Sequence, residues 1–338
     1  MRPACWIFVL AVCAAAAPSD DRDCAPCHRE IAARFRATPM ARALAPVSEC
    51  EILQKNRELI FHDEGYESRI ARDGDRSILT VKGGGENLTA TLLWAFGRGQ
   101  AGQTYVFQID GVYYESRISF YNALHGVDLT MGARPGKPRS MEEAAGHRLG
   151  PRDALECFGC HSSGAVSGGR LHLETIAPGV GCESCHGPAS RHVQAVRAGD
   201  VAGAKMTKLA GSTTEEISEL CGRCHRTWSQ ISTSGPRGVL NVRFQPYRLT
   251  NSKCYNVSDA RIRCIACHDP HGPLETVASS YDSRCVACHS AKAGGKMCAV
   301  AKQNCVTCHM PKIELPGAHA RFTDHQIRIA RAGDPYPN

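Results

Sequence analysis

The sequence predicts a fold of short α-helices and irregular loops wrapped on covalently bound prosthetic groups, with a small antiparallel β-sheet as an insert. Three observations predict it. The chain has 19 cysteines among 338 residues, which indicates disulfides, a metal or a covalent cofactor. Most cysteine motifs lie in residues 157–309, and the strand-like runs lie in residues 58–121. Charged residues make up 22% of the chain, which excludes a disordered polyelectrolyte.

Residues 1–17, MRPACWIFVLAVCAAAA, have the pattern of a secretory signal peptide, because one early Arg precedes an apolar stretch that ends in small residues. This predicts a mature chain in the periplasm or outside the cell. The alternative is a lipoprotein signal in which Cys13 is lipidated; Leu10 suits that interpretation and Val12 suits it poorly. A buried N-terminal helix is a third interpretation. Beyond residue 17 no apolar run reaches the roughly 18 residues that span a bilayer, so no transmembrane span is expected.

One motif, Cys-x-x-Cys-His, occurs seven times, and every Cys-x-x-Cys in the chain is followed by His. The seven copies are Cys24-Ala-Pro-Cys27-His28, Cys157-Phe-Gly-Cys160-His161, Cys182-Glu-Ser-Cys185-His186, Cys221-Gly-Arg-Cys224-His225, Cys264-Ile-Ala-Cys267-His268, Cys285-Val-Ala-Cys288-His289 and Cys305-Val-Thr-Cys308-His309. They are called motifs 1 to 7 below.

The spacing of this motif has a chemical reason. Two cysteines three residues apart lie on one side of a helical turn, so that their sulfurs can add to the two vinyl groups on one haem edge. The following His then binds the iron as proximal ligand, which is the c-type haem attachment pattern. Zinc sites and disulfides also use paired cysteines, but neither requires His after each pair. The sequence therefore predicts seven covalent haem c groups.

Eight histidines lie outside the motifs and are candidates for the distal position of each iron. His271 follows His268 by three residues, and three residues reach at most about 10 Å, too little to pass round a porphyrin. For the same reason His192, six residues after His186, is expected to bind a neighbouring haem. The predicted distal ligands are His147, His192, His271, His319 and His325; His125 and His172 are undecided, and His62 is expected at the surface.

The first haem has a different candidate. A helix is expected from His28 to Thr38, ended by Pro39, and Met40 follows. A Met40 thioether ligand would raise the potential of that haem relative to two histidines. The alternative is a Met packed in the core.

Three cysteines of the mature chain lie outside the motifs: Cys50, Cys254 and Cys298. In an oxidising compartment two of them can pair. Cys254 and Cys298 are the favoured pair, since both lie among the closely spaced C-terminal motifs. The alternative is three buried free cysteines.

The motifs and the strand-like runs divide the chain into four expected parts. These are the signal peptide 1–17, a segment 18–48 with one haem, a β-rich insert 49–146 and a six-haem domain 147–338. The strand-like runs are Glu58–Phe61, Ser77–Val81, Thr89–Phe96, Thr104–Ile109 and Val112–Phe120, with a hairpin signal at Asp110-Gly111.

The longer motif contexts, Cys182-Glu-Ser-Cys-His-Gly-Pro, Cys264-Ile-Ala-Cys-His-Asp-Pro-His271 and Cys305-Val-Thr-Cys-His-Met-Pro-Lys312, resemble those of bacterial multihaem c-type cytochromes. They are most similar to relatives of the tetrahaem cytochrome that accepts electrons in hydroxylamine oxidation. The resemblance covers residues 157–325 and 24–40. It implies a multihaem cytochrome c fold, electron transfer outside the cytoplasmic membrane, and stacked and perpendicular haem pairs. It also favours His192, His271 and His325 as distal ligands and Cys254 with Cys298 as a bridge.

The expected function is that of a secreted electron carrier with seven closely spaced, mostly bis-His haems. Its partners would be redox proteins, either other cytochromes or a membrane quinol-linked complex. The second interpretation is an oxidoreductase that acts on a small nitrogen or sulfur compound at one open haem, at His161, His225 or His289. A redox sensor, a binding module or a subunit of a haem filament is the third. The formal charge is +7. The Lys and Arg side chains that produce it are interpreted as partners of the haem propionates and not as a nucleic-acid binding surface.

Overall fold

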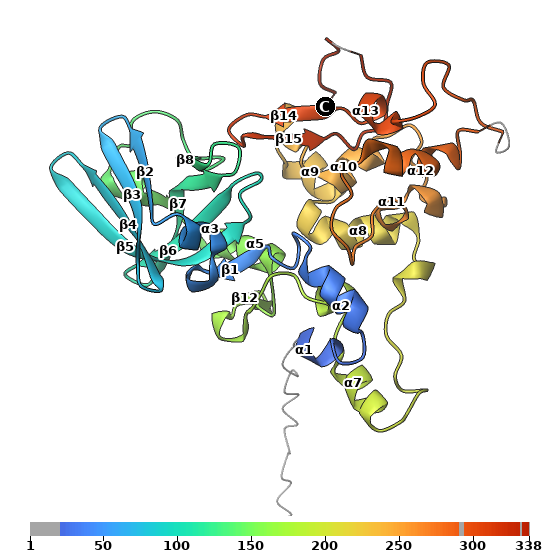
Figure 1. The fold of residues 1–338 in the computed structure, drawn as a ribbon, viewed down its shortest axis with the longest axis horizontal. Helices are drawn as coiled ribbons and strands as arrows, with labels where there is room; N and C mark the ends of the chain where they lie inside the picture. Colours follow the sequence, from blue (N-terminus) through green and yellow to red (C-terminus); the bar gives the residue numbers. More distant parts are fainter. Residues whose placement is uncertain (1–20, 291–293, 332, 338) are drawn as a thin grey trace, which may run out of the picture.

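The computed structural model describes residues 21–290, 294–331 and 333–337. The predicted signal peptide, and Cys13 with it, lie outside these residues. In the described part of the chain, no helix is both long and apolar enough to cross a membrane. Figure 1 shows a large β-sheet on one side and short helices with loops on the other.

The sheet has nine strands, and each pairs antiparallel with its neighbours. Seven follow chain order from β2 to β8, β1 pairs with β5, and β9 pairs with β7. The strands are β1 (Leu44–Pro46), β2 (Glu58–Asp63), β3 (Tyr66–Asp73), β4 (Arg76–Gly83), β5 (Glu86–Gly97), β6 (Gln103–Ile109), β7 (Val112–Tyr121), β8 (Gly126–Leu129) and β9 (Gly146–Arg148). Such a sheet is not the small insert that the sequence predicted.

All five predicted runs lie within strands, and the hairpin signal at Asp110-Gly111 joins β6 to β7. The sheet is larger because four strands, β1, β3, β8 and β9, were not predicted, and β3 is the longest of them. Its sequence YESRIARD is mostly polar, and only Ser68 and Ile70 are buried. A strand that sits between two others is held by main-chain hydrogen bonds, which do not require apolar side chains.

The sheet has an apolar core of its own. Alternate residues of β4 are buried, as expected for a sheet with one covered face. The buried cluster includes Leu79, Val81, Leu92, Tyr105, Phe107, Ile118 and Phe120. Beside it, α3 (Glu51–Lys55) and α4 (Met141–Ala145) contribute Leu53 and Ala144. These residues form one continuous cluster made of side chains.

The described residues between 150 and 337 form short helices, as predicted, together with small hairpins that were not predicted. The helices are α5 (Pro151–His161), α6 (Glu183–His186), α7 (Ser190–Arg197), α8 (Thr214–His225), α9 (Trp228–Ser234), α10 (Gln245–Thr250), α11 (Cys264–Cys267), α12 (Asp282–Val286) and α13 (Cys305–His309). The hairpins pair β10 (Ser162–Ser163) with β13 (Ala177–Pro178), β11 (Val166–Ser167) with β12 (Arg170–Leu171), and β14 (Lys312–Leu315) with β15 (Ala320–Thr323). We call residues 150–337 the motif region.

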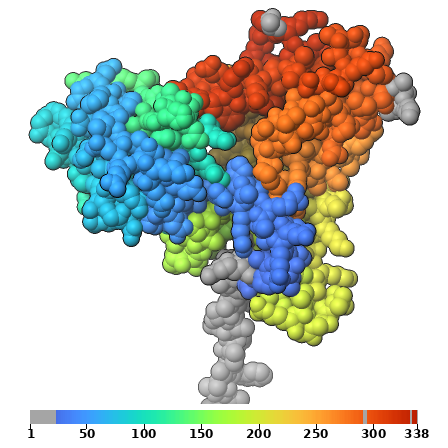
Figure 2. Space-filling model, viewed as in Figure 1, coloured from blue at the N-terminus to red at the C-terminus, as the bar shows by residue number. Residues whose placement is uncertain are grey.

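The first motif is distant in sequence but not in space. Its helices are α1 (Asp21–Cys24) and α2 (Arg29–Arg36). Arg34 of α2 forms an ion pair with Asp269 of motif 5's loop, and Asp23 pairs with Arg197 at 3.2 Å. In Figure 2 this blue segment lies between the sheet and the orange C-terminal part. The segment is therefore packed on the motif region.

Candidate haem centres

The seven motifs adopt the helical turn that their chemistry needs. In motifs 1, 3, 5 and 6 the His amide donates to the carbonyl of the first Cys at 2.9, 3.0, 2.9 and 2.9 Å, respectively. Motifs 2, 4 and 7 lie at the C-terminal ends of α5, α8 and α13. One helical turn places both sulfurs on the same side, with the imidazole next to them.

Three motif histidines face a second histidine ring. The ring centres are 6.4 Å apart for His28 and His192, and 6.0 Å apart for His186 and His271, with the planes inclined by 6°. The third pair joins His268 to a ring that follows the last motif, His325, at 6.1 Å. In every pair the second histidine comes from a different segment of the chain.

These separations fit one iron between the rings. A metal–imidazole bond is about 2 Å long and the ring centre lies roughly 1 Å behind the nitrogen, so two imidazoles on opposite sides of one metal have centres about 6 Å apart. No group of three or more Cys, His, Asp or Glu side chains within the described residues is arranged to hold a metal directly. Two imidazoles and a porphyrin are the ligand set that these pairs fit.

Hydrogen bonds at Nδ1 orient several of these rings. Nδ1 lies 2.7 Å from the Ala204 carbonyl in His192 and 3.0 Å from the Thr323 carbonyl in His325. His309 has the same contact with the carbonyl of Arg328, at 2.8 Å. An N–H donated from Nδ1 leaves Nε2 as the nitrogen that can bind a metal, and such partners fix the ring orientation.

The sequence did not predict these main-chain carbonyl partners of Nδ1, because a residue of any type can supply a carbonyl and so leaves no signal in the sequence.

Burial favours the neutral form of three of these rings. It lowers the pKa of His325 to about 4, and it also lowers the pKa of His268 and His161. A carbonyl contact with Ala43, at 3.0 Å, opposes this effect in His161. Neutral imidazole is the form that binds metals.

Cysteines of different motifs meet in three places. Cys224 of motif 4 lies beside Cys160 of motif 2, and Cys221 of the same motif lies beside Cys264 of motif 5. The third pair, Cys285 and Cys305, joins motifs 6 and 7. Because these sulfurs carry the vinyl edges of the haems, the edges of those haems would lie next to one another.

Some predicted distal ligands lie elsewhere. Nε2 of His319 is hydrogen bonded to Asp128 of β8 at 2.8 Å, and its ring packs on Tyr121 of β7. This histidine therefore docks the β14–β15 hairpin on the sheet, and its metal-binding nitrogen is occupied. The ring that faces His28 is that of His192, and not the Met40 thioether predicted for it.

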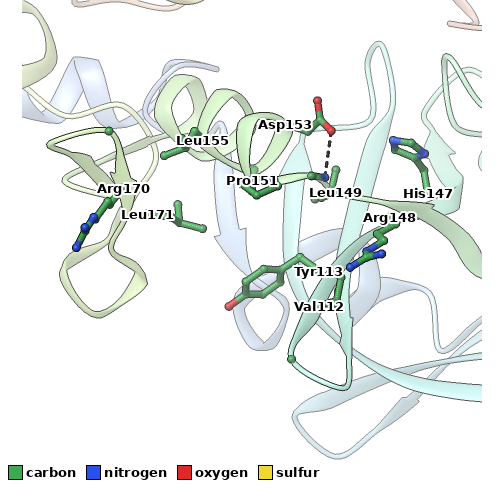
Figure 3. A pocket seen from close by; sticks show the side chains of 14 residues that line it. Val112, Tyr113, His147, Arg148, Leu149, Pro151, Asp153, Leu155, Arg170 and Leu171 are labelled. Carbon is green, nitrogen blue, oxygen red and sulfur yellow. Dashed lines mark hydrogen bonds between the residues drawn. The ribbon is translucent and has the colours of Figure 1, made fainter.

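His147 is exposed in β9, opposite Glu115 of β7. It lines a pocket of about 360 Å³ together with Cys157, Cys160 and His161 of motif 2. A neighbouring cavity of about 780 Å³ also includes His147. Figure 3 shows Arg148 and Tyr113 of the sheet on one side of this cavity and Arg170 and Leu171 of β12 on the other. Both pockets lie where the sheet meets α5.

The predicted Cys254–Cys298 bridge is not formed. Both thiols are free and exposed. They do not pair with each other, because each lies beside different residues. Cys254 lies near Cys285 and Cys288 of motif 6, whereas Cys298 accepts hydrogen bonds from the backbone of its own loop. Cys50 is buried and free, and donates to Gln103 Oε1 at 3.0 Å.

Two comparisons with known proteins found a similarity. The family model described as "Cytochrome c554 and c-prime" matches residues 128–187, which contain motifs 2 and 3. The multiheme cytochrome MtrA of Shewanella baltica (strain OS185) is 24% identical over 188 residues, which cover 44% of this chain and 56% of that protein. The chain thus spans just over half the length of this curated relative. No solved structure matches. In these stretches the chain is therefore similar to multihaem c-type cytochromes.

Proposed function

We propose that this chain binds seven haem c groups and transfers electrons among them, with at least three of the irons held by two histidines. The observation that carries the proposal is the set of three histidine pairs whose ring centres lie 6.0 to 6.4 Å apart. Two strong ligands close the iron to substrates, which suits electron transfer better than catalysis. The resemblance to the multiheme cytochrome MtrA supports the same function.

The residues that would hold the haems follow from the motifs and the pairs. The cysteine pair of each motif would bind one haem, and the motif His would be its proximal ligand. His192, His271 and His325 would be the distal ligands of the haems on motifs 1, 3 and 5, respectively. Haem iron alternates between ferric and ferrous and so carries one electron.

The proposed haems are linked to one another in two ways, through neighbouring motif cysteines and through distal histidines. Sulfur contacts link motif 2 to motif 4, motif 4 to motif 5, and motif 6 to motif 7. Distal ligands link motif 1 to the segment after motif 3, motif 3 to the segment after motif 5, and motif 5 to the segment after motif 7. Together these links connect all seven motifs in one network.

Periplasmic or extracellular location, through the signal peptide, is part of this proposal. The partners would be other cytochromes or a quinol-linked membrane complex, and a role next to hydroxylamine oxidation remains one version of it. Low-temperature EPR of the ferric holoprotein tests the function. We expect mostly low-spin signals that nitrite and hydroxylamine leave unchanged. A strong high-spin signal that responds to either compound would contradict it.

An oxidoreductase at the motif 2 haem is the second candidate, because of the pocket beside His161. Glu115 and Asp153 line that pocket, and burial raises the pKa of the Glu115 carboxyl, so that it can hold a proton close to where the haem would lie. His147 lines the same pocket and could instead be the distal ligand of this haem. The Glu115→Gln variant separates the two candidates, because only an enzyme would lose turnover of a nitrogen or sulfur compound.

A further inference from the structure

The guanidinium of Arg248, in α10, is fully buried together with the carboxylate of Asp324; both side chains are 0% exposed. Nε donates to Oδ1 at 2.8 Å and Nη2 donates to Oδ2 at 3.0 Å, so the contact is bidentate. Nη1 donates to Asn241 Oδ1 at 3.2 Å and to the Pro337 carbonyl at 2.8 Å. Arg248 therefore ties three separate segments together.

Buried ion pairs of this kind seldom exist for stability alone. Removing two charges from water costs several kcal/mol, and apolar residues of similar volume often stabilise a fold equally well. A planar, bidentate contact does fix one segment relative to another. The position of the pair is therefore the informative feature.

Asp324 immediately precedes His325, the ring that faces His268 at 6.1 Å. The same carboxylate accepts a hydrogen bond from the Gln326 amide at 3.0 Å. Ser252 Oγ, two residues after α10, donates to the His325 carbonyl at 3.1 Å. Both sides of the His325 backbone are thus fixed to the end of α10.

The network also reaches motif 7. The second oxygen of Asp324 accepts a hydrogen bond from Arg328 Nη1. The Arg328 amide donates to the His309 carbonyl at 3.1 Å, and the Arg328 carbonyl lies 2.8 Å from His309 Nδ1. The Asp324 carboxylate therefore supports both His325, which lies opposite motif 5, and His309, the histidine of motif 7.

We propose that Arg248 and Asp324 are positioning residues for two haems: they hold His325 against the motif 5 iron and, through Arg328, orient His309 on the motif 7 iron. The inference rests on the proposed function, since it takes both histidines as ligands. Partners of this outer kind typically change metal affinity or activity by 10- to 100-fold. Substitution of either residue would therefore change two haems that belong to motifs far apart in sequence.

The test uses the full holoprotein and low-temperature EPR, because a merely structural pair would not alter the spin state of a haem. The variants are Arg248→Met, Asp324→Asn and the milder Arg248→Lys, which keeps the charge but cannot form two parallel bonds. The matched control is Arg117→Met. Arg117 forms a buried pair with Asp63 in the sheet, at 2.9 and 2.7 Å from Nε and Nη2, and their side chains are 6% and 14% exposed.

We expect Arg248→Met and Asp324→Asn to convert about one haem per chain from low spin to high spin. Asp324→Asn should also shift the g values of a second low-spin haem. Arg117→Met should leave the spectrum unchanged. Wild-type spectra for both motif-region variants, or the same conversion in Arg117→Met, would overturn the inference. If Arg248→Met does not fold, Arg248→Lys is held to the same criterion.

A further variant, His325→Ala, separates this inference from the proposed function. Loss of one low-spin haem in His325→Ala with no change in Arg248→Met or Asp324→Asn refutes the positioning role alone. An unchanged His325→Ala spectrum refutes the ligand assignment, and the positioning role falls with it. If Asp324→Asn changes only one haem, the part of the inference that concerns His309 is wrong.

Discussion

The sheet and the motif region are built on different principles. The sheet buries a continuous apolar cluster that includes Leu79, Tyr105 and Phe107, all 0% exposed. The cluster that packs β14 in the motif region has three buried residues, Val242, Leu315 and Ala318, and the fully buried Arg248–Asp324 pair lies in the same region. The motif histidines and cysteines of that region are the residues that would hold the proposed haems. The comparison indicates that the sheet is held by apolar side chains, and it leads us to expect that the motif region depends on its proposed haems.

Production of the chain without attached haem should have the largest effect on the difference between the sheet and the motif region. We expect residues 58–149 to keep slow amide exchange and residues 150–337 to exchange more rapidly, because the larger apolar core lies in the sheet. Hydrogen exchange followed by mass spectrometry, compared with the holoprotein, measures both regions at once. Equal protection of the two regions in the apoprotein would show that the motif region does not depend on haem.

A cavity in the sheet core should destabilise the sheet but leave the haems unchanged. Phe107→Ala removes a fully buried ring and should lower the free energy of unfolding by about 3–5 kcal/mol. Urea unfolding followed by far-UV circular dichroism measures the loss. Val300→Ala is the matched control, because Val300 is 93% exposed and should change stability by less than about 0.5 kcal/mol. A changed haem spectrum in Phe107→Ala would mean that the two regions are coupled.

Two histidines test the difference between the two regions, because the ring of His192 lies opposite a motif histidine and the ring of His319 packs on the sheet. His192→Ala should convert about one haem per chain to high spin, because it removes the ring that faces His28. His319→Ala should leave the spin states unchanged, because its Nε2 is bonded to Asp128. EPR of the two variants is the measurement. The reverse result would restore the original prediction for His319.

The smallest expected effect is a pH dependence confined to the sheet. Burial raises the pKa of Tyr105 well above its usual value of 10, and its hydroxyl donates to Gln103 Oε1 at 3.2 Å. A raised pKa in the folded state gives stability that is complete below the unfolded pKa and is lost as the pH rises above it. Sheet stability should therefore fall above about pH 10, and Tyr105→Phe should flatten that slope. An identical slope in the variant would mean that Tyr105 does not cause it.

The sequence predicted the features that depend on local spacing. The helical turn at each motif follows from Cys-x-x-Cys-His. The short reach of three residues led to the prediction that His271 ligates a neighbouring haem, and its ring centre lies 6.0 Å from that of His186 in another motif. Five strand-like runs were found because their apolar residues mark the buried face.

Features that depend on tertiary contacts were not predictable. Strand β3 carries charged residues, and its place between β2 and β4 is set by pairing. His319 has the same residue type as a ligand, and only the nearby Asp128 shows its different role. Arg248 has nothing in its local sequence to indicate that Asp324, 76 residues away, would bury it.

The intact mass of the purified, denatured holoprotein tests the central claim most directly, because thioether-bound haem stays attached when the fold is lost. The account predicts a mass increment of seven haems on the mature chain, one for each Cys-x-x-Cys-His motif. An increment of fewer than six haems would contradict it.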